Sequence, residues 1–146
     1  ETAYAGILKT SPDIGMYTSV ETGDCSVRNA FAANDAVSFG SIINAYTQPF
    51  LLLYNHRKDR GYRMEAFAKA IRQSAAKPVC IGVIGEHKKA CARYMQRTTG
   101  IRAQAVERPK EWIQAQNVRH VLCAGNIKGE GRQFLEEMIE EARQNV

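Results

Sequence analysis

The stretch Phe50-Leu51-Leu52-Leu53-Tyr54, followed directly by Asn55-His56-Arg57-Lys58-Asp59-Arg60, decides the fold. The continuous apolar run predicts a strand that is buried on both faces, as strands of parallel sheets are. A helical pattern begins near Gly61, so the polar cluster lies at a junction between a strand and a helix. Ligands often bind at such junctions in α/β sheets, because backbone N–H groups, a helix N-terminus and polar side chains meet there.

Strand and helix alternate along most of the remaining chain. A hairpin is predicted from residues 17–20 and 26–32, joined by Glu21-Thr22-Gly23-Asp24. Further strands are predicted at residues 50–54, 79–84, 101–106 and 118–124, and helices at 35–45, 61–74, 87–97, from Pro109, and at 129–143. We therefore predict an α/β fold: a Rossmann-like, mostly parallel sheet with helices on both faces, preceded by an N-terminal hairpin and linker.

Composition narrows the class of protein. The 146 residues suit one domain, and the formal charge of +5 favours acidic partners such as nucleotides or polycarboxylates. No nucleic-acid partner is expected, because the basic residues form no clustered stripe with stacking aromatics. The cysteines show no Cys-x-x-Cys pair and no metal-ligand spacing with histidine, so we expect buried, reduced thiols and no metal site. They are Cys25, Cys80, Cys91 and Cys123.

The residues that follow each predicted strand are the candidates for function, since parallel strands bring them to one edge of the sheet. Asp35 suits either a ribose hydroxyl or the N-cap of the next helix. Arg57, Arg60 and Arg63 suit carboxylate or phosphate oxygens, while Asp59 suits either the same site or a brace for one of these arginines.

Two further loops contribute polar groups to the same edge. Glu86 and His87 suit either an acid–base pair or the cap of a helix. Asn126 lies between Gly125 and Gly129, where glycines permit a close approach of backbone to ligand and are also ordinary in turns. No G-x-x-x-x-G-K-[ST] sequence is present, so the chain is not expected to hold a nucleoside triphosphate tightly by itself.

Four motifs, in order, resemble one family. They are Asn29-Ala30-Phe31-Ala32-Ala33-Asn34-Asp35, Asn55-x-Arg57-x-Asp59-Arg60-x-x-Arg63, Ile84-Gly85-Glu86 and Gly125-Asn126-Ile127-x-Gly129. Together they resemble the C-terminal part of the CapB-type ligase component of poly-γ-glutamate synthase in capsule biosynthesis, which is similar to Mur ligases and folylpolyglutamate synthases. Residues 1–16 resemble the end of the central-domain helix and the linker out of it, and residues 17–146 the C-terminal α/β domain. Because Glu1 already lies in that helix tail, we expect a fragment or processed piece of a longer protein.

The resemblance implies an ATP- and Mg-dependent amide ligase that phosphorylates a carboxylate and joins an incoming amine to it. Asn34, Asp35 and Ser38 are then expected to face the nucleotide. The residues expected to bind glutamate or poly-γ-glutamate are Asn55, Arg57, Asp59, Arg60, Arg63, Glu86 and Asn126. The phosphate-binding loop belongs to the preceding part of the ligase, so the fragment is expected to be inactive alone. Implied partners are the rest of its own chain and the membrane components of the capsule synthase, which place it in the cytoplasm at the inner face of the membrane.

Some residues depart from the family pattern. Phe39 stands where threonine is usual, His56 where cysteine is usual, and Met16 where Mur ligases place an arginine that contacts ATP. A different reading of the same residues remains open: a Rossmann-like binding module without enzymatic activity, which recruits an acidic partner or assembles a complex.

Overall fold

The computed structural model describes residues 19–31, 33 and 35–144. The strands within these residues are β1 (Ser19–Glu21), β2 (Ser26–Asn29), β3 (Phe50–His56), β4 (Ile81–Gly85), β5 (Ala103–Ala105) and β6 (His120–Gly125). The helices are α2 (Ala36–Asn44), α3 (Gly61–Gln73), α4 (Lys88–Thr99), α5 (Pro109–Gln116) and α6 (Glu130–Gln144). The predicted helix tail and linker of residues 1–16 lie outside the described residues.

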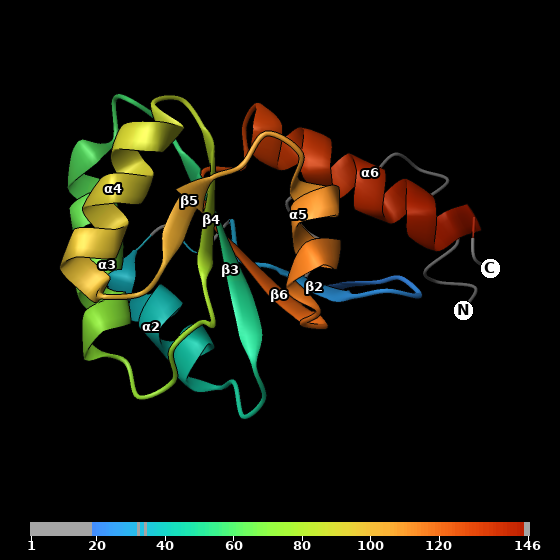
Figure 1. Cartoon of the computed structure of the whole chain (residues 1–146), viewed down its shortest axis with the longest axis horizontal. Helices are drawn as coiled ribbons and strands as arrows, with labels where there is room; N and C mark the ends of the chain where they lie inside the picture. Colours follow the sequence, from blue (N-terminus) through green and yellow to red (C-terminus); the bar gives the residue numbers. More distant parts are fainter. Residues whose placement is uncertain (1–18, 32, 34, 145–146) are drawn as a thin grey trace.

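All described strands join one sheet in the order β1-β2-β6-β3-β4-β5. The β1–β2 hairpin is antiparallel, and every other neighbouring pair is parallel. Helices α2, α3 and α4 lie on one side of the sheet and α5 and α6 on the other (Figure 1). The predicted α/β architecture, with its N-terminal hairpin and helices on both faces, is therefore confirmed.

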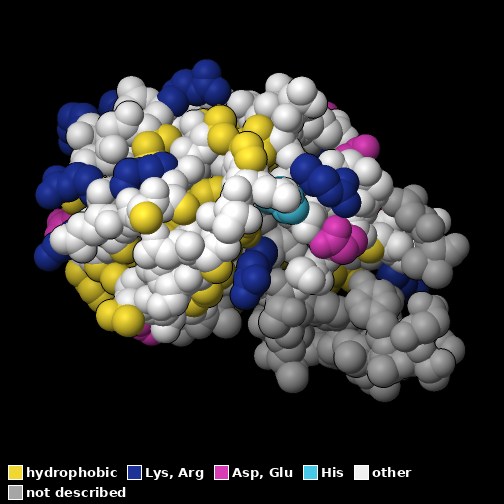
Figure 2. Space-filling view, turned by 90° about the horizontal axis from the view of Figure 1, so that it is seen from below, with side chains coloured by type: hydrophobic (Ala, Val, Ile, Leu, Met, Phe, Trp, Pro, Cys, Tyr) yellow, Lys and Arg dark blue, Asp and Glu magenta, His cyan; other side chains and the backbone are white. Residues whose placement is uncertain are grey.

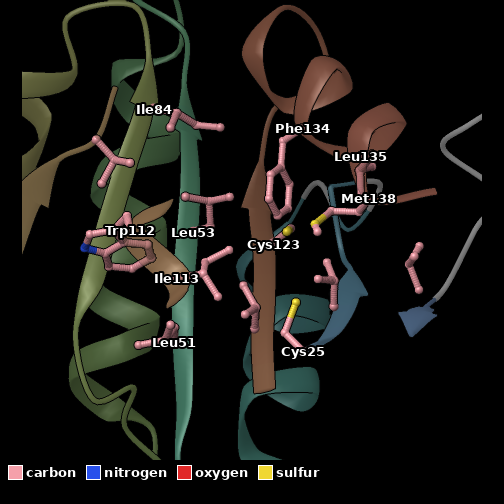
Figure 3. Close-up of a cluster of buried hydrophobic side chains, with 14 of the residues drawn as sticks. Cys25, Leu51, Leu53, Ile84, Trp112, Ile113, Cys123, Phe134, Leu135 and Met138 are labelled. Carbon is pink, nitrogen blue, oxygen red and sulfur yellow. The ribbon is translucent and has the colours of Figure 1, made fainter. Parts of the chain in front are cut away.

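The central strand β3 shows why the sheet needs two helical layers. Alternate residues of β3 enter different cores: Leu51 and Leu53 pack with α5 and α6, whereas Leu52 and Tyr54 pack with α2, α3 and α4. Each of these side chains is at most 1% exposed. Figure 3 shows the first core, where Phe134 and its neighbours on α6 reach toward β6 and α5 contributes its aromatic residue. A strand this apolar requires cover on both faces.

A glycine on β4 makes room for the aromatic residue of α5. A Cβ atom at Gly82 would lie 2.8 Å from the ring of Trp112. Trp112 is only 7% exposed, so its ring lies directly on the strand. The α5 helix begins at Pro109, whose fixed φ angle suits the first helical position, as the sequence predicts.

One boundary differs from the prediction in a way that affects the site. Strand β3 continues to His56, so Asn55 and His56 belong to the strand and not to the loop after it. The extension occurs because both residues pair with the neighbouring strands: Asn55 lies level with Ile84 and Gly125, and His56 with Gly85. Their side chains consequently point to opposite faces of the sheet.

The surface at the amino ends of the strands has no single basic stripe. Figure 2 looks onto this face, and its Lys and Arg side chains occupy several separate places. Among the residues that the structure describes, no helix is long and apolar enough to cross a bilayer.

Candidate functional site

The carboxyl ends of the parallel strands form one rim. Strands β2 and β3 both pair with β6, and the loops after β2, β3, β4 and β6 leave the sheet at the same edge. Asp35 follows β2 and Arg57 follows β3, with only β6 between the two strands. The predicted parallel order, which brings the loops that carry these residues to one sheet edge, is therefore confirmed, and the shared role of their side chains stays a prediction. We call this edge, from Asp35 to Asn126, the carboxyl rim.

Asp35 caps helix α2. Its Oδ1 accepts a hydrogen bond from the Ser38 backbone N–H at 2.8 Å, and its Oδ2 accepts one from the Ser38 hydroxyl at 3.0 Å. These bonds hold the pKa of Asp35 below its usual value, with the backbone bond as the largest cause. The N-cap reading is thus confirmed. Both side chains are exposed and keep lone pairs for a ligand, and Asn34 lies outside the described residues.

The loop after β3 carries a braced arginine. Nη2 of Arg57 donates to Oδ2 of Asp59 at 2.9 Å, with the Arg57 side chain 29% exposed and that of Asp59 55% exposed. The brace confirms one of the two roles expected for Asp59. It holds the guanidinium in one place while leaving part of it accessible, which is what recognition of a planar carboxylate requires.

Two buried nitrogens, one at the end of β3 and one in the loop after it, lack hydrogen-bond partners within the described residues. They are Nδ1 of His56 and Nε of Arg60. His56 is 6% exposed and lies on the α3 and α4 side of the sheet. Burial lowers the pKa of His56; nearby His87 lowers it further, and Glu86 opposes the shift. A neutral imidazole therefore lies beneath the arginine loop at pH 7.

Helices α3 and α4 begin at the carboxyl rim without a side-chain cap. Neither Arg60 nor His87, at the two N-cap positions, bonds the first turn through its side chain, and neither first turn contains an acidic residue. The first N–H groups of a helix have no intrahelical acceptor and carry partial positive charge. The rim therefore offers anion-attracting groups from two helices beside Arg57, Arg60 and Arg63.

Glu86 links two loops of the rim. Its Oε1 accepts from the Lys58 backbone N–H at 3.1 Å, and its own N–H donates to the His56 carbonyl at 2.9 Å. His87 has a positive φ of 52° and makes no capping bond with its side chain. Within the described residues, Glu86 holds the loop after β3 in place, and the cap expected for this pair is not formed by side chains.

Asn55 is enclosed below the rim. Its Nδ2 donates to the carbonyls of Asn126 and Lys128, at 2.5 and 2.7 Å, and the residue is 2% exposed. A Cβ atom added at Gly85 or Gly131 would collide with the Asn55 amide. Both amide protons are thus used within the protein. These contacts favour support of the rim over direct contact with substrate.

Asn126 shapes the loop between β6 and α6. Its Oδ1 accepts from the Lys128 backbone N–H at 2.8 Å, and its backbone N–H donates to the Asn55 carbonyl at 2.9 Å.

Lys88 also lies at this edge, where its Nζ is 3.2 Å from carboxylate oxygens of both Glu107 and Glu130. Lys88, at the start of α4, was not among the predicted site residues, and His56 was noted only as a departure from the family pattern. Their positions at the end of β3 and in the first turn after β4 were the signal for both.

The described residues contain no cluster of metal-binding side chains and no exposed cysteine. No three His, Cys, Asp or Glu side chains there lie close enough to hold a metal ion. All four cysteines are buried and free, as expected.

Comparison with known proteins identifies the family. The profile described as "Poly-gamma-glutamate synthase CapB C-terminal domain" matches residues 16–141. No curated protein matches the chain. Among solved structures, the chain is similar to MurF ligase from Thermotoga maritima in complex with ADP, with a TM-score of 0.54 and 8% identity. The similarity covers 99% of this chain and 38% of that chain, and at this identity it shows the fold alone. Since the family match extends over most of its residues, the chain belongs to the family of poly-gamma-glutamate synthase CapB C-terminal domains.

Proposed function

We propose that this protein is the substrate-binding domain of an ATP-dependent amide ligase that makes poly-γ-glutamate. In this role it positions the incoming glutamate and closes over the nucleotide held by the preceding part of the ligase. The observation that carries the proposal is the carboxyl rim, which gathers Arg57, Arg60 and Arg63 beside two uncapped helix N-termini in a member of this family.

Glutamate presents two carboxylates and one amine, and the rim has groups suited to the carboxylates. The Arg57 guanidinium is held by Asp59 and partly exposed, so it can donate two parallel bonds to a carboxylate without first being ordered. Arg60 and Arg63 form no ion pair within the described part of the chain. They add positive charge at the start of α3, which would attract the carboxylates of a growing acidic polymer.

Such binding accelerates amide formation by orientation. The glutamate nitrogen attacks the carbon of an acyl phosphate, the new C–N bond forms, and the C–O bond to phosphate breaks as phosphate leaves. The attacking amine must lose a proton during the step. Holding the carboxylates fixes the amine relative to the acyl carbon, and closure excludes water that would hydrolyse the acyl phosphate.

The nucleotide has candidate contacts on this domain, whereas no cluster of three metal-binding side chains exists among the described residues. Asp35 and Ser38 are exposed at the start of α2 and suit a ribose hydroxyl. Magnesium in this proposal is held mainly by the preceding part of the ligase, together with the phosphates of the nucleotide. When bound there it would neutralise phosphate charge.

An Arg57→Ala variant of the full-length ligase tests the proposal. Glutamate-dependent ADP release should fall by at least about tenfold, because a charged hydrogen bond to substrate is worth about 1.5–3 kcal/mol. Arg57→Lys should recover only part of the loss, since an ammonium cannot form the paired bonds. The matched control is Arg72→Ala, an exposed arginine in the last turn of α3. Unchanged turnover in Arg57→Ala, with circular dichroism like that of the parent, would remove Arg57 from the site.

A further inference from the structure

Helix α4 carries an exposed line of positive charge that starts at the carboxyl rim. Lys89, Arg93 and Arg97 recur at every fourth residue and are all exposed, while the opposite side of the helix is buried. Side chains four residues apart are neighbours on a helix surface, so these three form one line about 12 Å long. The helix, from Lys88 to Thr99, contains no acidic residue. We call the three side chains the α4 basic row.

The charge of the α4 basic row is not neutralised within the described part of the chain. None of its three side chains forms an ion pair there, although exposed glutamates of α6, such as Glu136 and Glu140, do pair with nearby arginines. Like charges four residues apart repel each other and weaken a helix slightly. An anion from outside the domain would relieve this repulsion.

A direct contact joins the start of α4 to the arginine loop. Oε1 of Glu86, three residues before Lys89, accepts from the Lys58 backbone N–H at 3.1 Å, and the Glu86 N–H donates to the His56 carbonyl at 2.9 Å. Lys58 follows Arg57, the partly exposed arginine of the proposed substrate site. The α4 basic row therefore begins beside the residues proposed to hold glutamate and extends away from them along the helix.

We infer that the α4 basic row binds the growing poly-γ-glutamate chain beyond its reacting end. This inference rests on the proposed function and adds a second contact region for the same polymer. Each γ-linkage uses the side-chain carboxylate of a glutamate and leaves its α-carboxylate free, so the polymer carries one negative charge per residue. A line of cations that starts at the glutamate site is complementary to a linear polyanion that extends from that site.

An anionic membrane surface is the competing occupant, and α4 suits it less well. Helices that bind to a membrane surface place an apolar face in the lipid. The large hydrophobic side chains that are exposed among the described residues are Val37, Tyr62 and Val79, and none of them belongs to α4. The α4 basic row thus has charge for a lipid headgroup but no apolar anchor, which favours the polymer.

Binding of labelled poly-γ-glutamate to the full-length ligase tests the inference. Fluorescence anisotropy at low salt should show about tenfold weaker binding when all three residues of the α4 basic row are replaced by alanine, and the parent should lose affinity as salt is raised. Arg93→Lys combined with Arg97→Lys should keep the affinity, because the row acts through charge. The matched control removes three exposed arginines of the α5 and α6 side and should bind like the parent. Its changes are Arg108→Ala, Arg132→Ala and Arg143→Ala.

Turnover separates this inference from the proposed function. With a long polymer as substrate, the triple alanine variant should have a KM about tenfold higher and an unchanged kcat, whereas a γ-linked glutamate dipeptide, too short to reach the row, should give parent values. Arg57→Ala should lower turnover with both substrates. If Arg57→Ala is active and the triple variant still loses the polymer, the glutamate site is wrong and the α4 basic row stands.

Three results would overturn the inference. The first is unchanged polymer affinity in the triple alanine variant, and the second is an equal loss in the control. The third is a loss of binding to vesicles of anionic lipid while polymer binding persists, which would assign the α4 basic row to a membrane surface.

Discussion

At the scale of single residues, Asn55 shows how a polar residue next to a site can serve the fold. Its amide donates to two loop carbonyls, and glycines surround it because larger residues would collide with it. We predict that Asn55→Ala destabilises the domain by about 1–3 kcal/mol, since it removes two hydrogen bonds that the buried amide donates to the carbonyls of Asn126 and Lys128. Urea unfolding measures this. Full stability combined with lost glutamate affinity would instead make Asn55 a ligand-binding residue.

His56 gives the domain a dependence on pH. Its pKa is lowered in the folded state, mainly by burial, so between that value and the ordinary value of about 6.5 the unfolded chain binds more protons. The stability contributed by neutral His56 is complete above about pH 6.5 and declines as the pH falls through this window. We predict that His56→Gln flattens the slope of unfolding free energy against pH between about 5 and 7. Denaturant titrations across that range measure the slope, and an equally steep slope in the variant would contradict the assignment.

At the scale of elements, the contact between α5 and β4 depends on the absence of a side chain at Gly82. A methyl group there would enter the space of the Trp112 ring, 2.8 Å away. We predict that Gly82→Ala costs about 1–3 kcal/mol by overpacking and shifts the fluorescence of Trp112, the single tryptophan of the chain. Gly40→Ala is the control: no atom lies within 4 Å of its added Cβ in α2, so it should stabilise the helix slightly. Similar losses in both variants would refute this explanation.

Elements also show what sequence could predict. The apolar run of β3, the Asp35 cap of α2 and Pro109 at the start of α5 follow from local patterns. The end of β3 does not, because Asn55 and His56 become strand residues only by pairing with β4 and β6. That pairing is a property of the assembled sheet. It decides that Asn55 turns toward α6 and that His56 lies under α3 and α4, which no local pattern could show.

At the scale of the whole molecule, the rim was predictable and its internal contacts were not. Parallel strand order alone brings Asp35, Arg57 and Asn126 to one edge. Which of these groups is already bonded depends on distances of a few tenths of an ångström, such as the 2.9 Å pair of Arg57 with Asp59 within one loop and the 3.1 Å bond from the Lys58 N–H to Glu86 between two loops. The prediction of substrate contacts for Arg57, Arg60 and Arg63 therefore remains a proposal.

The proposal also implies that the domain is incomplete as a catalyst. The chain has no phosphate-cradling loop of the G-x-x-x-x-G-K-[ST] type, and such loops supply most of the grip on nucleoside triphosphates. We predict that the 146-residue chain alone releases no phosphate from ATP and glutamate, measured against the full-length ligase. Steady release by the purified chain would show that its own residues complete an active site.

The burial of every cysteine makes the protein easy to label at chosen positions. Burial raises the pKa of Cys25 and Cys123, and that of Cys91 to about 12, and Cys80 is only 1% exposed. Maleimide dyes react with exposed thiolates, so they should leave these native thiols unmodified while attaching to a cysteine introduced on the surface. One dye here and one elsewhere in the proposed full-length ligase would let single-molecule energy transfer measure whether the distance between them changes on addition of ATP.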